Sequence, residues 1–188
     1  MKKIALILAV LLLCGAVFGC SAKPAAAQAT AANADAAPVF TGKYVVDAKY
    51  VLDNLDNANV LLVDARGEDA AKTGTVKGAI VVTWQLFASV GDGAPGDEMW
   101  GTILDTDRLS AALSQTGISP DREVILFADA QKGWGADGRI AWELIAAGFP
   151  NVKMVNGGYD ALVAVGAPTT TDAAAFTPAE VTISKIDA

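Results

Sequence analysis

Residues 60–66, Val60-Leu61-Leu62-Val63-Asp64-Ala65-Arg66, place a continuous apolar run directly before an acid and a base. A short run that is apolar at every position is typical of a strand buried on both faces of a parallel sheet. Similar runs occur at residues 79–82, 124–127 and 152–155. Between the runs, apolar residues recur at helical spacing over residues 47–55, 107–116 and 139–147. This alternation predicts an α/β fold in which helices flank a central, mostly parallel sheet on both faces.

The loops at the carboxyl ends of the strands are the expected functional region of such a fold. Three loops therefore matter most, namely those that follow Val63, Val82 and Phe127. Thr106 or Asp107 is the expected N-cap of the middle helix, because short polar side chains cap helices. Residues 177–185 form a late extended segment, which we expect to be either an edge strand or a strap across the domain.

The N-terminus has the features of an export signal. Lys2 and Lys3 precede the apolar run 4–17, which is shorter than the ~20 residues of a membrane span. The next residues, Val17-Phe18-Gly19-Cys20, resemble the lipobox of bacterial lipoproteins. That resemblance implies cleavage after residue 19 and lipidation of Cys20, whereas an uncleaved anchor helix is the alternative.

The composition then divides the chain into three parts. Residues 1–19 are the expected signal, and residues 20–38 are the lipidated cysteine with an Ala-rich tether. This tether has too few large apolar residues to offset the entropy of ordering. Residues 39–188 are the expected single folded domain.

Charge and residue counts exclude several classes of function. Removal of residues 1–19 takes away two lysines and no acid, so the formal net charge changes from −7 to −9. Such an acidic chain is a poor match for nucleic acid. The chain has no His, and its two Cys are Cys14, in the signal, and Cys20. We therefore expect no thiol or imidazole catalysis, no Cys- or His-based zinc site and no cofactor in the folded domain.

Several motifs in order along the chain resemble the rhodanese family of sulfurtransferase domains. They are the stretches 61–66, 74–79, 117–120, 147–161 and 166–168, together with Trp84. The resemblance covers about residues 44–168 and implies a three-layer α/β domain. In active members of that family, a Cys after the third core strand takes up sulfur as a persulfide on a loop of backbone N–H groups.

This chain departs from the family pattern at the position of the nucleophile. Ala128 stands where the catalytic Cys is expected, and the family's turn His is Thr75. The loop from Ala128 to Arg139 is longer than the catalytic loop. It resembles the corresponding loop in the non-catalytic N-terminal half of two-domain thiosulfate and mercaptopyruvate sulfurtransferases. That loop ends in an Arg followed by an aromatic residue, and Arg139 and Trp142 occupy those places here.

Two groups of residues are candidates for a functional site. Asp64 and Arg66 follow the first core strand, and a structural ion pair is a better explanation for them than a functional role. On the loop, Asp129, Lys132, Trp134 and Arg139 are candidates for contact with a ligand or a partner. Trp134 either projects as a binding anchor or folds back over the loop. Lys132 and Arg139 are expected either to hold a small anion with the loop N–H groups or to be ordinary surface charges.

These observations lead to three hypotheses of function. The first is a non-catalytic binding or assembly module, anchored by lipid and docking on an exported or membrane protein. The second is a sulfurtransferase or sulfur carrier that acts with the thiol of a partner. The third is a binder of a small sulfur oxyanion. The expected location is the extracytoplasmic side of the cell membrane or the outer membrane, and Ser21 permits the latter in a bacterium with two membranes.

Overall fold

The computed structural model describes residues 42–91 and 93–187, so the predicted signal, Cys20 and the tether lie outside the described residues. A five-stranded sheet in the order β1-β8-β7-β2-β4 forms its centre, and all of its strand pairs are parallel. The elements in chain order are β1 (Val45–Val46), α1 (Ala48–Asp53), β2 (Val60–Asp64), α2 (Glu68–Ala71), β3 (Thr75–Val76), β4 (Ile80–Val81), the 3-10 turn η1 (Trp84–Leu86), β5 (Ala88–Ser89), β6 (Thr102–Ile103), α3 (Thr106–Thr116), β7 (Glu123–Phe127), α4 (Ala136–Ala146), β8 (Val152–Val155), α5 (Gly158–Ala164) and β9 (Thr169–Thr170).

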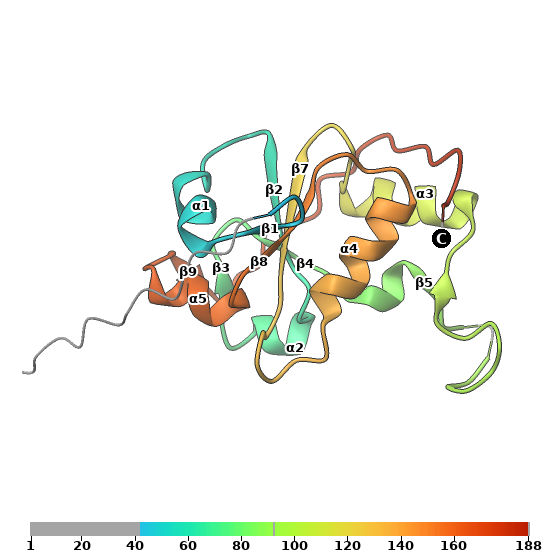
Figure 1. Cartoon of the computed structure of the whole chain (residues 1–188), viewed down its shortest axis with the longest axis horizontal. Coiled ribbons are helices and arrows are strands. Elements are labelled where there is room, and N and C mark those ends of the chain that lie inside the picture. The colour runs from blue at the N-terminus through green and yellow to red at the C-terminus, as the bar shows by residue number, and fades with distance from the viewer. Residues whose placement is uncertain (1–41, 92, 188) are drawn as a thin grey trace, which may run out of the picture. The chain divides into compact units, whose positions relative to one another are not determined.

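The central strands bury both of their faces, as the continuous apolar runs predict. Along β7, Val124 and Leu126 belong to one hydrophobic cluster, which includes residues of α3 and α4. Ile125 and Phe127 belong to a second cluster, which includes residues of α1 and α5. Figure 1 shows these two helix pairs on opposite sides of the sheet. The three-layer α/β architecture is therefore confirmed.

The helix boundaries differ from the prediction at the end of α1, which is Asp53 rather than Leu55, and at the starts of α3 and α4. The N-cap of α3 is Asp105 rather than Thr106 or Asp107, because its carboxylate accepts the N–H of Arg108 at 2.9 Å. Helix α4 begins at Ala136 rather than Arg139. Gly135 has φ +88°, a backbone turn that starts the helix early although residues 136–138 have no apolar periodicity.

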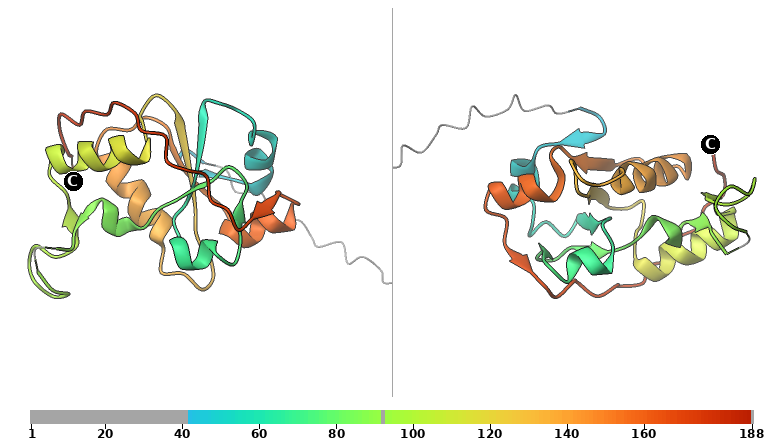
Figure 2. Two further views of the ribbon diagram at one scale, coloured as in Figure 1. Left: turned by 180° about the vertical axis from the view of Figure 1, so that it is seen from behind. Right: turned by 90° about the horizontal axis from the view of Figure 1, so that it is seen from below.

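The C-terminal segment 177–187 is a strap and not a strand. Its backbone is held by Ser110 and Ser114 of α3, whose side-chain oxygens accept the N–H groups of Ile183 at 2.9 Å and Val181 at 3.1 Å. Val181 and Ile183 are buried in the hydrophobic cluster that includes residues of α3 and α4. Figure 2 shows the strap running across the back of the domain along α3. The second of the two alternatives for this segment is thus correct.

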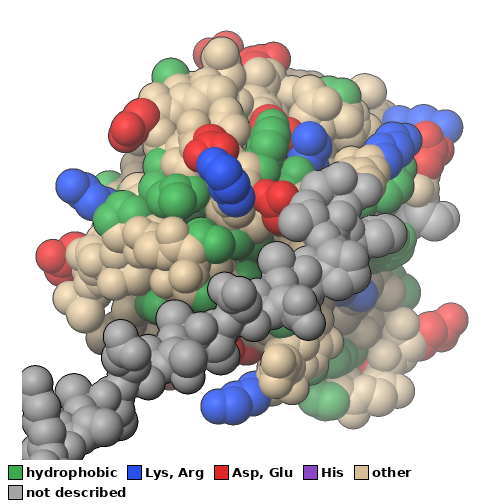
Figure 3. All heavy atoms as spheres, turned by 60° about the vertical axis from the view of Figure 1, so that its left-hand side comes forward, with side chains coloured by type: hydrophobic (Ala, Val, Ile, Leu, Met, Phe, Trp, Pro, Cys, Tyr) green, Lys and Arg blue, Asp and Glu red, His purple; other side chains and the backbone are tan. Residues whose placement is uncertain are grey.

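The surface of the described region mixes charges of both signs. On the face drawn in Figure 3, acidic and basic side chains alternate with apolar ones. Within residues 42–91 and 93–187, no helix combines the length and the hydropathy that crossing a bilayer requires.

Candidate functional site

The candidate site is built on the loop between β7 and α4, residues 128–135. The loop closes on itself, because Gly133 donates its N–H to the carbonyl of Asp129 at 2.9 Å. It is also tied to the start of α5, where Tyr159 donates its N–H to the carbonyl of Ala128 at 2.9 Å. This approach requires glycine at position 158, since a Cβ there would lie 2.1 Å from the oxygen of Ala128. The loop is therefore a cradle with a fixed base, and the methyl group of Ala128 is buried in it.

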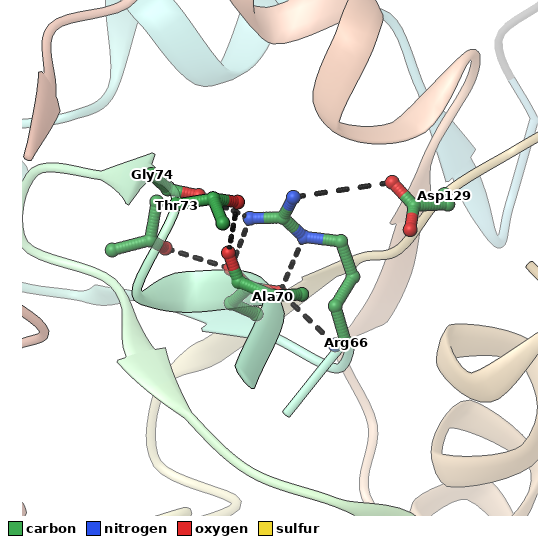
Figure 4. A network of polar contacts seen from close by, with 7 residues as sticks. Arg66, Ala70, Thr73, Gly74 and Asp129 are labelled. Atoms are coloured by element: carbon green, nitrogen blue, oxygen red, sulfur yellow. Dashed lines mark hydrogen bonds and ion pairs between the residues drawn. The ribbon is translucent and has the colours of Figure 1, made fainter. Parts of the chain in front are cut away.

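A buried ion pair supports the cradle from the end of β2. Arg66 donates from Nε and Nη2 to the two carboxylate oxygens of Asp64, at 2.9 and 2.7 Å. Nη2 also donates to the carbonyl of Gly74, and Thr75 donates its hydroxyl to Asp64 at 2.7 Å. Figure 4 shows this network, with the guanidinium extending toward Asp129. Asp64 and Arg66 therefore tie the end of β2 to the turn before β3.

The position of Arg66 is further fixed by an aromatic ring. Its guanidinium carbon lies 3.7 Å from the ring centre of Tyr159, which is itself stacked on Phe127. Burial alone would lower the pKa of Arg66, but the hydrogen bonds and the charge of Asp64 outweigh it, so the pKa is raised. Arg66 thus stays charged, and only one edge of its guanidinium faces the cradle.

Above the cradle lies a pocket of about 190 Å³. It is lined by Ala65, Arg66, Thr83, Trp84, Gln85, Ala128, Asp129, Gly133, Trp134 and Ala136. These residues come from the segments after β2, β4 and β7, which the sequence indicated, and from Ala136 at the start of α4. Trp134 packs edge-on against Trp84, with 5.9 Å between ring centres, yet its side chain remains 65% exposed. Trp134 therefore forms part of the pocket wall and also projects into solvent.

The structure separates the four predicted loop residues. Asp129 and Trp134 line the pocket. Lys132 is exposed on the same loop, with no hydrogen bond or ion pair among the described residues. Arg139 does not belong to the loop, because it lies within α4, and it is absent from the pocket lining.

Arg139 is instead part of a second, buried ion pair. Its Nε donates to Oε1 of Glu143 at 2.9 Å, and its Nη2 donates to the carbonyl of Gly101. Glu143 is fully buried, and its Oε2 has no hydrogen-bond partner in the described region. Burial raises the pKa of Glu143 to about 7, against the opposing effect of Arg139. This acid was not singled out from the sequence, although its position three residues after Ile140 and one before Leu144 places it on the apolar face of the helix.

Tryptophans gather at one side of the pocket in a way that the sequence did not indicate. Trp84 contacts Trp100 as well as Trp134, and the ring centres of Trp84 and Trp100 lie 5.6 Å apart. The guanidinium of Arg139 lies 5.0 Å from the ring centre of Trp142 and 5.5 Å from that of Trp84. All four tryptophans of the chain are therefore connected around this site. The sequence placed Trp84 after a core strand and so near the site. It did not show which rings contact Trp84, because Trp100 and Trp134 lie in distant segments of the chain.

Comparison with known proteins assigns the family. Residues 47–164 match the family described as the rhodanese-like domain. This chain belongs to the rhodanese family. The sulfur carrier protein TtuD of Thermus thermophilus is 24% identical over 140 residues, a match that covers 71% of this chain and 44% of the relative. A protein of Mycobacterium leprae is 30% identical over 129 residues, with coverage of 68% and 43%.

Solved structures of rhodanese proteins show the same fold. The 3-mercaptopyruvate sulfurtransferase from Leishmania major superposes with a TM-score of 0.63 at 21% identity, and the match covers 81% of this chain and 43% of that one. A 3-mercaptopyruvate sulfotransferase from Escherichia coli gives a TM-score of 0.64 at 16% identity, with coverage of 77% and 57%. This rhodanese domain thus spans less than half the length of the curated relatives that it matches.

The chemistry available in this rhodanese site follows from its side chains. The pocket presents a carboxylate, a guanidinium, two indoles, an amide and a hydroxyl, and the sequence from residue 21 onward has no Cys. Within the described residues, no three His, Cys, Asp or Glu side chains are placed to hold a metal ion. The side chains that line the pocket are therefore suited to holding a ligand, and none of them can carry a persulfide.

Proposed function

We propose that this protein is an extracytoplasmic lipoprotein whose rhodanese domain acts as a non-catalytic binding and assembly module. The lipid on Cys20 anchors it to the cell membrane or the outer membrane. The face around the cradle docks on an exported or membrane protein.

One observation carries the proposal: Trp134 stands exposed at the rim of a cradle whose base is Ala128. Ala128 has no nucleophilic atom, so the loop has no group that takes up sulfur. Trp is enriched among the residues that dominate binding energy at interfaces, and 65% of this side chain is exposed. A rigid cradle with an apolar projection beside it suits recognition of a partner.

The docking role is tested by crosslinking and affinity capture from membranes with the full chain. Trp134→Ala removes the projecting ring, and we expect it to reduce recovery of the partner about tenfold. Val163→Ala is the matched control, since Val163 is exposed on α5, outside the pocket lining. Equal recovery with Trp134→Ala and the unaltered protein would rule out docking through this face.

Anchoring is tested separately by labelling cells with an alkyne fatty acid. We expect the label to appear in the full chain and to disappear in Cys20→Ser. Release of an unlabelled protein into the medium by both forms would contradict the anchor.

The second candidate function is sulfur transfer with a thiol from a partner. It is favoured by the family and by the relatives' names, which include a sulfur carrier and 3-mercaptopyruvate sulfurtransferases. The assay measures sulfur transfer from thiosulfate and from mercaptopyruvate to cyanide. We expect no turnover above buffer, and Ala128→Cys serves as the control that returns a thiol to the cradle. Turnover by the unaltered protein alone would overturn the non-catalytic proposal.

The third candidate function is binding of a sulfur oxyanion. Its support is the free edge of Arg66 together with the start of α4, where Gly135 offers no side-chain cap to the helix N–H groups. Thermal-shift measurements with sulfite, sulfate and thiosulfate test this candidate directly.

A further inference from the structure

The pocket above the cradle holds two opposite charges that do not fully satisfy each other. The side chain of Arg66 is only 6% exposed, and its Nη1 has no hydrogen bond among the described residues. The closest acid to Nη1 is Asp129, whose Oδ1 lies 3.9 Å away. That separation is too long for a hydrogen bond. A fixed donor therefore faces an acceptor across a gap.

The two groups differ in their freedom to move. Arg66 is held by Asp64, by the carbonyl of Gly74 and by the ring of Tyr159. Asp129 has a side chain that is 42% exposed and accepts no hydrogen bond from the described residues. A ligand between them therefore meets a preorganised cation and an acid that can adjust. Preorganisation of this kind reduces the entropic cost of binding.

The balance of charge around the pocket selects against a simple ion. Of the charged residues, Arg66 and Asp129 line the pocket, whereas Asp64, which pairs with Arg66, and the exposed Lys132 lie outside its lining. A lone anion would be repelled by Asp129, and a lone cation would be repelled by the free edge of Arg66. A ligand that carries both charges on neighbouring atoms satisfies both groups at once.

We propose that this pocket binds a free α-amino acid in its zwitterionic form. The carboxylate accepts from Nη1 of Arg66 and from the N–H of Ala136, the first residue of α4, which also lines the pocket. The ammonium donates to Asp129. The side chain of the ligand lies against the indoles of Trp84 and Trp134. The volume of about 190 Å³ suits a ligand of this size, smaller than the usual drug-sized compound.

This site goes beyond docking and does not depend on it, because the pocket takes a small molecule whether or not a protein covers the face. It also differs from an oxyanion site, since it requires a positive group on the ligand. Binding of a free amino acid and binding of the end of a peptide are distinct outcomes, because a peptide terminus carries only one of the two charges.

The test compares three probes that share a four-carbon side chain, using the full chain purified in detergent. Norleucine has both charges, norleucinamide lacks the carboxylate, and hexanoate lacks the ammonium. Binding is followed by calorimetry and by tryptophan fluorescence, since two indoles line the pocket. We expect norleucine to bind at least about tenfold more tightly than either analogue. This difference corresponds to the charge-assisted hydrogen bond that each analogue lacks.

The variants separate the two ends of the ligand. Asp129→Asn should weaken the binding of norleucine and norleucinamide and should tighten that of hexanoate, while Trp134→Ala should weaken the binding of all three. Glu98→Gln, an exposed acid outside the pocket lining, is the matched control and should change nothing. Circular dichroism verifies that each variant is folded.

Three results would overturn the inference. Hexanoate or thiosulfate binding as tightly as norleucine would make this an anion site. Norleucinamide binding as tightly as norleucine would make it a cation site. Absence of saturable binding for every probe would remove the small-molecule site, and capture of a protein partner through Trp134 would then still stand by itself.

Discussion

Protonation of Glu143 should control the stability of the fold between pH 4.5 and pH 7. This carboxyl is fully buried with one oxygen unpaired, and burial raises its pKa from 4.5 to about 7. The folded state therefore binds the proton more tightly than the unfolded chain does. The stabilisation by this proton is complete below pH 4.5 and is lost as the pH rises through about 7. Each pKa unit corresponds to about 1.4 kcal/mol, so the free energy of unfolding falls by at most about 3 kcal/mol across this range.

The matched variant is Glu143→Gln, a neutral side chain of the same shape that still accepts from Arg139. Its free energy of unfolding should be close to that of the unaltered protein at pH 4.5 and higher by up to about 3 kcal/mol at pH 8. Urea unfolding of residues 24–188, followed by circular dichroism at intervals of half a pH unit, measures both curves. The chain has no His, so no imidazole titrates in this range.

Glu98→Gln serves as the control, because Glu98 is exposed and should leave the slope unchanged. An equal slope in Glu143→Gln and the unaltered protein would refute the assignment. So would a stability that rises between pH 5 and pH 7, since this requires a carboxyl whose pKa is lowered on folding.

Three further substitutions and one control test the supports of the site and of the C-terminal strap. Gly158→Ala should cost more than about 2 kcal/mol in urea unfolding, because its Cβ would lie 2.1 Å from the cradle carbonyl and must displace backbone. Asp64→Asn should lower stability by about 3–5 kcal/mol by leaving a buried guanidinium without its counter-charge. Asp69→Asn, at an exposed ion pair, is the control for Asp64→Asn and should show no measurable loss in the same urea unfolding measurement. Ser114→Ala should speed amide exchange in the strap 177–187 with little change in the core, which mass spectrometry resolves by segment.

The sequence predicted the central sheet and that helices cover both of its faces, because these features depend on local patterns. Runs such as 124–127 are apolar at every position, and a strand buried on both faces requires such a run. The start of α4 was predicted three residues late. It is set by the backbone angle at Gly135, which a search for apolar periodicity does not register.

The site was predictable only where single positions carried the information. Ala128 and Trp134 were identified, since one is an alanine at the position of the family's nucleophile and the other stands between two glycines. The clustering of Trp84 with Trp100 was not, because it depends on how the segment after β5 folds back. The unpaired oxygen of Glu143 was also hidden, because helical spacing places this residue on the apolar face but does not show which partners its carboxylate finds.

The rhodanese motifs in this chain have structural duties that do not depend on sulfur chemistry. Asp64 and Arg66 hold the end of β2, and neither can be removed alone without leaving a buried charge. Gly158 is required by the approach of α5 to the cradle. These positions are therefore needed whether or not residue 128 carries a nucleophile, and their presence carries no information about activity. Evidence about function must come from side chains that face the pocket without supporting the fold, and Asp129 and Trp134 are residues of that kind.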